Sequence, residues 1–264
     1  MTLALHKARS HMPFTLCHPA IVLPLHARAR RLTSLPALVI GSMAPDFVYF
    51  LPLATDGYFT HSLPGIFLYC LPAGLLVYCI YHALLRDAFI EWAPAAVSAR
   101  MRPMAPWLKA DVRTLGIVLV SLLIGAASHI AWDAFTHPNT AVVRHVALLR
   151  MQVTLGSYSI PLFKVLQHMS SLAGFIVTAA YLRHWLATTE AGALSHRPLS
   201  GLRGLYVLVV IALAGLGGGA AGLMLKHSKS GEHALFNVVV TGMAMAALAV
   251  VLLCVARKFA VSRR

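Results

Sequence analysis

The chain has 264 residues, of which 59% are hydrophobic and 11% are charged, and its formal net charge is +14. Soluble domains carry about 25% charged residues, so the composition excludes a soluble globular enzyme, a disordered tail and a fibrous protein. The sequence predicts an integral membrane protein. Its Lys and Arg residues lie between apolar runs, where such residues set topology and contact lipid headgroups, so we expect membrane lipids as partners and no nucleic acid.

In chain order, we expect residues 1–11 to form a disordered N-terminal extension and residues 12–264 a single membrane-embedded helical domain. Pro13–Leu25 is apolar but too short to span a bilayer, which indicates a re-entrant or interfacial segment. Leu35–Ala54 is long enough, but Pro45 and Asp46 interrupt it. Five clear spans follow: Leu63–Leu85, Thr114–Phe135, Pro161–Leu182, Leu205–Leu225 and Ala234–Ala256. The predicted fold class is all-α, a multi-spanning transmembrane bundle of five spans plus one Pro-Asp-interrupted or re-entrant segment.

The distribution of Lys and Arg indicates the topology. The loops Arg86–Arg113 and Arg183–Arg203 and the C-terminus together hold twelve of these residues, against five on the opposite face. If Leu35–Ala54 spans the membrane, five N-terminal cations join the twelve; if it does not, they join the five and the count decides little. We expect an integral membrane protein with a cytoplasmic C-terminus.

The strongest candidates for chemistry are ionisable residues in or beside one apolar span, where they are costly. His129, Asp133 and His137 are spaced four residues apart, so on a helix they project from one stripe. Two imidazoles and a carboxylate on one stripe are typical ligands of Zn²⁺ or a similar divalent cation. A hydrogen-bonded polar stripe in a helix bundle explains the same spacing, and both interpretations stay open.

Three other segments supply similar residues: His18 in the first apolar stretch, Asp46 after Pro45, and His61 at the start of the next apolar run. The order of the spans predicts one membrane depth, away from the basic loops, for a group of five residues: His61, His129, Asp133, His137 and His168. His18 joins this group only if Leu35–Ala54 does not fully span, or if His18 lies deep in a re-entrant segment.

Three motifs carry a resemblance to a known family. Met12-Pro13-Phe14-Thr15-Leu16-Cys17-His18-Pro19, Gly41-Ser42-Met43-Ala44-Pro45-Asp46 and Thr60-His61-Ser62-Leu63-Pro64-Gly65 resemble the bacterial membrane family catalogued as domain of unknown function 4184. The resemblance covers most of the chain from Met12. Where the family usually has Ser before its first histidine, this chain has Cys17, which leaves His18 in place. The resemblance implies an integral protein of the bacterial cytoplasmic membrane, but the family has no established activity and so the resemblance implies no reaction.

More distantly, the chain is similar to membrane-bound metal-dependent hydrolases and to zinc-dependent phospholipase C. Those proteins share an early histidine, a Pro-Asp, a Thr-His-Ser and a His-x-x-x-Asp on a helix. The similarity implies metal ligands at His18, Asp46, His61, His129 and Asp133, with His137 as an addition. The phospholipase pattern continues with a His-x-x-x-Glu that this chain lacks, and His168 is the nearest candidate, so one or two ions are implied instead of three.

We therefore expect a membrane-embedded metal-dependent hydrolase, with zinc as its divalent cofactor, that acts on phosphoesters of lipids or other amphiphiles through a metal-activated water. Asp46 or Asp133 is the expected general base. The alternatives are an ion or small-solute transporter, because intramembrane histidines and carboxylates also mark ion pathways, and a non-catalytic membrane scaffold.

Overall fold

Helices form most of the chain in the computed structural model, which describes residues 15–50, 56–101, 111–192, 202–225 and 231–262. Within these residues, five helical segments are long and apolar enough to cross a membrane: Leu63–Trp92, Val112–His145, Leu162–Thr188, Gly204–Met224 and Ala234–Ala260. The predicted all-α fold with five spans is therefore confirmed. The expected extension at residues 1–11 lies outside the described residues.

The spans differ in regularity. Four helices are continuous: α9 (Val112–Thr136), α11 (Leu162–Thr188), α12 (Leu202–Leu225) and α13 (Gly231–Ser262). The first span is built from five consecutive pieces, of which two are π-helical turns: α5 (Leu63–Gly65), η3 (Ile66–Cys70), α6 (Leu71–Ile80), η4 (Tyr81–Leu85) and α7 (Arg86–Trp92). The helix α8 (Ala95–Met101) follows in the basic loop.

The segment before the first span folds as a short hairpin. Its pieces are η1 (Thr15–Cys17), α1 (Pro19–Arg28), α2 (Leu35–Met43), η2 (Ala44–Asp46) and α3 (Phe47–Phe50). Pro45 has no backbone N–H to continue an α-helix, and the chain tightens into the 3₁₀ turn of η2 after Met43. The apolar helix Leu35–Phe50 is shorter than the five spans. Residues 51–54 of the predicted segment Leu35–Ala54 lie outside the described part of the chain.

Two hydrogen bonds set the direction of this hairpin. The backbone N–H of Ser34 donates to Ser121 Oγ at 3.0 Å, and His129 Nδ1 lies 2.7 Å from the carbonyl oxygen of Ser42. The helix α2 therefore runs in the same direction as α9, and the loop that joins α1 to α2 points toward the Arg113 end. Three exposed arginines at this loop, Arg28, Arg30 and Arg31, thus lie toward the basic loops, while both ends of the hairpin lie deeper in the protein.

The contact between α2 and α9 is made by backbone. A Cβ atom added to Gly125 of α9 would lie 2.5 Å from the carbonyl oxygen of Leu38, and one added to Gly41 of α2 would collide with the carbonyl oxygen of Leu122. Both positions therefore need glycine for the helices to come this close. This close packing holds α2 and the following η2 turn against the part of α9 that carries His129.

The helix α9 begins and ends at clear signals. The side chain of Asp111 accepts a hydrogen bond from the backbone N–H of Thr114 at 2.8 Å, which caps the N-terminus. After Thr136 the chain turns at His137-Pro138 into a small cap made of α10 (Ala141–His145), η5 (Ala147–Arg150), β1 (Gln152–Leu155) and β2 (Tyr158–Pro161). The two strands pair antiparallel around Gly156, whose φ of 62° suits glycine. This hairpin was not predicted, and Pro161, the expected start of a span, lies in β2.

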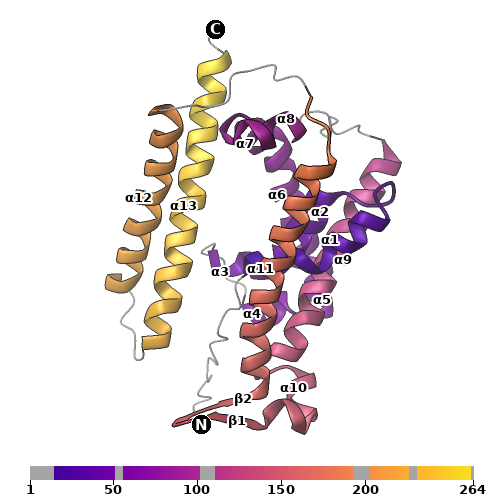
Figure 1. Cartoon of the computed structure of the whole chain (residues 1–264), viewed down its shortest axis with the longest axis vertical. Coiled ribbons are helices and arrows are strands. Elements are labelled where there is room, and N and C mark those ends of the chain that lie inside the picture. The colour runs from indigo at the N-terminus through magenta and orange to yellow at the C-terminus, as the bar shows by residue number, and fades with distance from the viewer. Residues whose placement is uncertain (1–14, 51–55, 102–110, 193–201, 226–230, 263–264) are drawn as a thin grey trace.

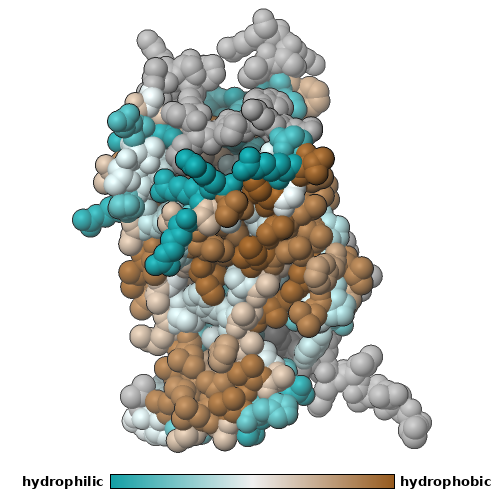
Figure 2. All heavy atoms as spheres, turned by 90° about the vertical axis from the view of Figure 1, so that its right-hand side faces the viewer, coloured by the Kyte–Doolittle hydropathy of each residue, from teal (hydrophilic) through white to brown (hydrophobic). Residues whose placement is uncertain are grey.

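The last two helices form an antiparallel pair beside the other helices (Figure 1). Gly218 and Gly222 of α12 lie against α13, as expected for small residues between membrane helices. At one end of α13 the ring of Phe236 packs edge-on against Tyr49, with centroids 6.0 Å apart. At the other end Arg257 pairs with Glu91 of α7. On the face that carries α1 and α9, Figure 2 shows a broad hydrophobic band with hydrophilic side chains along its upper part, as a membrane-embedded surface requires.

Candidate metal site

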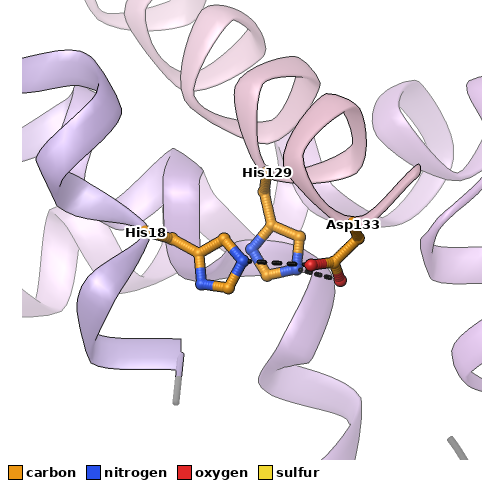
Figure 3. A group of neighbouring side chains, drawn as sticks. All are labelled: His18, His129 and Asp133. Carbon is orange, nitrogen blue, oxygen red and sulfur yellow. Dashed lines mark hydrogen bonds and ion pairs between the residues drawn. The ribbon is translucent and has the colours of Figure 1, made fainter. Parts of the chain in front are cut away.

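Five of the predicted site residues meet in the interior of the bundle. His18 immediately precedes α1, Asp46 ends η2, His61 follows the short helix α4 (Gly57–Thr60), and His129 and Asp133 lie one turn apart on α9. Figure 3 shows His18 reaching from its own segment toward His129 and Asp133, which both project from the same side of α9. Residues from four separate segments thus converge because the hairpin packs its two ends against one stretch of α9.

One group of donor atoms consists of Asp46 Oδ1, His61 Nε2 and His129 Nε2. The two nitrogens are 3.2 Å apart, Asp46 Oδ1 lies 3.4 Å from His61 Nε2, and it lies 3.7 Å from His129 Nε2. Ligands of a tetrahedral zinc ion with bonds of about 2.0–2.2 Å lie about 3.3–3.6 Å from one another. The three edges lie within or about 0.1 Å outside this range, so the triangle approximates one face of a zinc coordination sphere.

A second group shares His129 and adds His18 and Asp133. His18 Nε2 lies 3.2 Å from Asp133 Oδ1, and His129 Nε2 lies 3.2 Å from Asp133 Oδ2. The rings of His18 and His129 are stacked, with centroids 3.9 Å apart. Because His129 belongs to both groups, it is the centre of the candidate site.

The histidine rings are oriented by backbone carbonyls. His129 Nδ1 donates to the carbonyl oxygen of Ser42 at 2.7 Å, and His61 Nδ1 donates to that of Gly57 at 2.8 Å. A carbonyl can only accept, so each Nδ1 carries the proton and each Nε2 points into the cluster. This is the arrangement of metal-binding histidines, whose second nitrogen donates to a carbonyl or carboxylate.

The cluster is buried except at one residue. His18 and His129 are fully buried, and Asp46 and Asp133 are 1% and 5% exposed. The side chain of His61 is 20% exposed, so the cluster meets the surroundings at His61. The ring of Tyr49 lies beside this opening, with its centroid 6.4 Å from that of His61.

The charges of the cluster need a counterion. Asp46 and Asp133 are buried carboxylates, and within the described part of the chain their ion pairs are with histidines and with no lysine or arginine. Burial lowers the pKa of His61, but its hydrogen bonds to Asp133 and Asp46 outweigh burial and raise this pKa to about 10. The two negative charges are therefore balanced either by protonated histidines or by one divalent cation.

The other two predicted ligands lie outside both groups. His137 is next to the cluster: its Nδ1 lies 3.5 Å from Asp133 Oδ1, and its Nε2 lies 3.4 Å from Gln167 Nε2. His137 therefore contacts Asp133 without belonging to either group of donor atoms. His168 is exposed on α11 and belongs to neither group of donor atoms.

Two polar neighbours were not predicted from the sequence. Thr15 is buried and its hydroxyl donates to Asp46 Oδ2 at 2.6 Å. Gln167 is buried and contacts His137, whereas the adjacent His168 faces outward. Thr15 lies within the first motif, three residues before His18, and its place there was the available signal. For Gln167 the signal was its position beside His168, but only the rotation of α11 decides which of the two faces inward.

The fold and this cluster define a multi-spanning helical membrane protein with a buried His/Asp centre. The chain belongs to the family described as Domain of unknown function (DUF4184), whose model matches residues 12–255. No curated protein and no solved structure matches the chain.

Proposed function

We propose that this protein is a membrane-embedded metal-dependent hydrolase whose cofactor is a divalent ion, zinc, held at His129. The observation that carries the proposal is the triangle of Asp46, His61 and His129, whose edges of 3.4, 3.2 and 3.7 Å suit a zinc ion with three protein ligands. The charge of Asp46 and Asp133 is compatible with such an ion, because a divalent cation compensates two carboxylates at once, as protonated histidines also do.

The two carboxylates take different parts in this proposal. Asp46, His61 and His129 would hold the ion, which when bound would supply Lewis acidity for the activation of a water and the polarisation of the ester. Asp133 Oδ2 lies 3.5 Å from His61 Nε2 and 3.2 Å from His129 Nε2, so it lies beside the position that the ion would occupy. Asp133 accepts the proton of the attacking water as general base. His18 and His137 hold Asp133 in place through its other oxygen, Oδ1.

The depth of the cluster supports an amphiphilic substrate. His129 lies seven residues before the end of α9 at Thr136, which is about 10 Å along the helix axis. His61 directly precedes the span that begins at Leu63, so the site lies near the edge of the apolar length of the protein, at the end that carries α10. A lipid phosphoester presents its headgroup at such a depth while its acyl chains stay in the bilayer. A soluble substrate would have to enter an apolar surrounding.

We further propose a bacterial cytoplasmic membrane as the location, with a cytoplasmic C-terminus. Arg28, Arg30 and Arg31 lie toward the end of α9 that begins at Val112, and so they join the twelve cations of the basic loops and the C-terminus. By the positive-inside rule this side faces the cytoplasm, and the cluster lies nearer the opposite face.

The proposal is tested with protein purified in detergent, stripped of metal with a chelator and reloaded with Zn²⁺. We expect hydrolysis of bis(p-nitrophenyl) phosphate or of a fluorescent phosphatidylglycerol by the reloaded protein, and a loss of at least 100-fold in Asp133→Asn, whose folding and zinc content are checked in parallel. Uptake of Zn²⁺ into liposomes without hydrolysis would instead support a transporter. If wild type binds no metal and the site variants only lose stability, the cluster is a packing network of a scaffold.

A further inference from the structure

A cavity lies at the other end of the molecule from the His/Asp cluster. It has a volume of about 420 Å³ and lies between η4 and α13, where it is lined by Leu84, Val255, Lys258 and Phe259. His61 precedes the first span and Leu84 lies 23 residues later, which corresponds to about 35 Å along a helix. The cavity is therefore separate from the candidate metal site.

The lining combines three apolar side chains with one cation and includes no carboxylate. The neighbouring Arg257 is neutralised by Glu91, because its Nε lies 2.5 Å from Glu91 Oε2. Lys258 Nζ donates to the carbonyl oxygen of Ala83 at 3.3 Å. This bond places the ammonium group at the edge of the cavity and leaves two of its three donors for another acceptor.

The position of the cavity limits what occupies it. The two spans that form its walls, Leu63–Trp92 and Ala234–Ala260, both end here, so the cavity lies where acyl chains give way to headgroups. Phe89 and Trp92, aromatic residues of the kind enriched at membrane boundaries, pack together on α7 with ring centroids 6.2 Å apart. A ligand with an apolar body and an anionic head suits both the apolar walls and Lys258.

We propose that this cavity binds an anionic phospholipid, with its phosphate on Lys258 and an acyl chain along Leu84, Val255 and Phe259. The lipid would contact both η4 and α13, and would thereby link the α12–α13 pair to the first span. Charge complementarity favours an anionic lipid over a zwitterionic one, because Lys258 has no acidic partner in the cavity lining. Lipid binding at this cavity does not depend on the proposed hydrolase activity.

The experiment uses the full-length protein, delipidated in detergent, and titrates it with dioleoylphosphatidylglycerol or dioleoylphosphatidylcholine while bound lipid is counted by native mass spectrometry. We expect one phosphatidylglycerol to be retained at least fivefold more strongly than phosphatidylcholine. The Lys258→Gln variant should lose this preference. Arg144→Gln removes an exposed arginine from α10, in the cap at the far end of the molecule, and should keep it. Inorganic phosphate at the same concentration should not compete, because it lacks the apolar part.

Leu84→Trp provides a second variant, since it adds a bulky ring at the cavity wall and keeps the lysine. Retention of phosphatidylglycerol should fall in this variant too, while Lys258→Arg should retain the lipid. The proposal is overturned if wild type retains both lipids equally, or if Lys258→Gln or Leu84→Trp, folded as judged by circular dichroism, binds phosphatidylglycerol as wild type does.

Discussion

His61 Nε2 lies 3.2 Å from His129 Nε2, although 68 residues separate the two histidines in the sequence. Each ring uses its Nδ1 proton on a backbone carbonyl, so the two Nε2 atoms face each other with only one lone pair apiece. Such a pair requires a proton or a metal ion between them. A metal ion at this position has consequences that can be measured.

The contact between α2 and α9 predicts unequal effects for two glycines of the same helix. Gly125→Ala places a methyl group 2.5 Å from the carbonyl oxygen of Leu38, whereas Gly116 has no atom within 4 Å of an added Cβ. We expect Gly125→Ala to cost about 1–3 kcal/mol through overpacking and to weaken metal binding, because the backbone that orients His129 moves. Gly116→Ala should leave stability unchanged or raise it slightly. Thermal unfolding in detergent compares the two, and equal melting temperatures would contradict the packing described.

The bond from Thr15 to Asp46 predicts a positioning role. Thr15→Val keeps the shape but removes the hydroxyl that donates to Asp46 Oδ2 at 2.6 Å. Loss of such an outer partner of a metal ligand typically costs about 10–100-fold in metal affinity, and we expect a loss in that range. Thr15→Ser should restore the affinity. Competition with a fluorescent zinc chelator measures it, and a valine variant that binds zinc like wild type would show that this hydrogen bond does not position the ligand.

Two adjacent residues of α11, Gln167 and His168, differ in whether they contact the candidate site. Gln167 is buried against His137, and His168 is exposed. Gln167→Leu should lower zinc affinity or phosphodiester hydrolysis about tenfold, because His137 loses its partner and Asp133 its support. His168→Leu should change neither. The reverse result, with His168 sensitive and Gln167 not, would place α11 in a different rotation.

Much of this architecture could be predicted from the sequence, because apolar length alone identifies the spans. The four-residue spacing of His129 and Asp133 also predicts correctly that they lie along one side of α9, whereas His137 follows the end of this helix and still contacts Asp133. The meeting of His18 with Asp133 could not be derived from spacing, because it depends on a hairpin whose two ends return to the same depth. Apolar length cannot distinguish such a hairpin from a span.

The features that were not predicted from the sequence were missed for identifiable physical reasons. The strands Gln152–Leu155 and Tyr158–Pro161 flank a two-residue Gly-Ser turn, which is a typical hairpin signal, but the apolar residues from Pro161 onward favour assignment to the next span. The selection of Gln167 instead of His168 depends on helix rotation, which a single sequence without a strong polar stripe leaves open.

The direction of the N-terminal hairpin predicts an accessibility pattern. In a Cys79→Ala background, which removes the exposed native cysteine, Arg31→Cys and Arg183→Cys should react with a membrane-impermeant maleimide from the same side, and Arg144→Cys from the other. The reason is that α2 and α9 run in the same direction, so the loop between α1 and α2 lies toward the Arg113 end. Labelling of Arg31→Cys together with Arg144→Cys would contradict this direction.

Metal content decides whether the His/Asp cluster is a metal site. Purified wild-type protein, reloaded with Zn²⁺ and freed of excess ion, should retain one or two equivalents by elemental analysis. His129→Ala should retain almost none, because His129 belongs to both groups of donor atoms, and His61→Ala should retain less than wild type. His168→Ala should match wild type. Negligible zinc in wild type, or the same zinc content in folded His129→Ala, would contradict a metal site at this cluster.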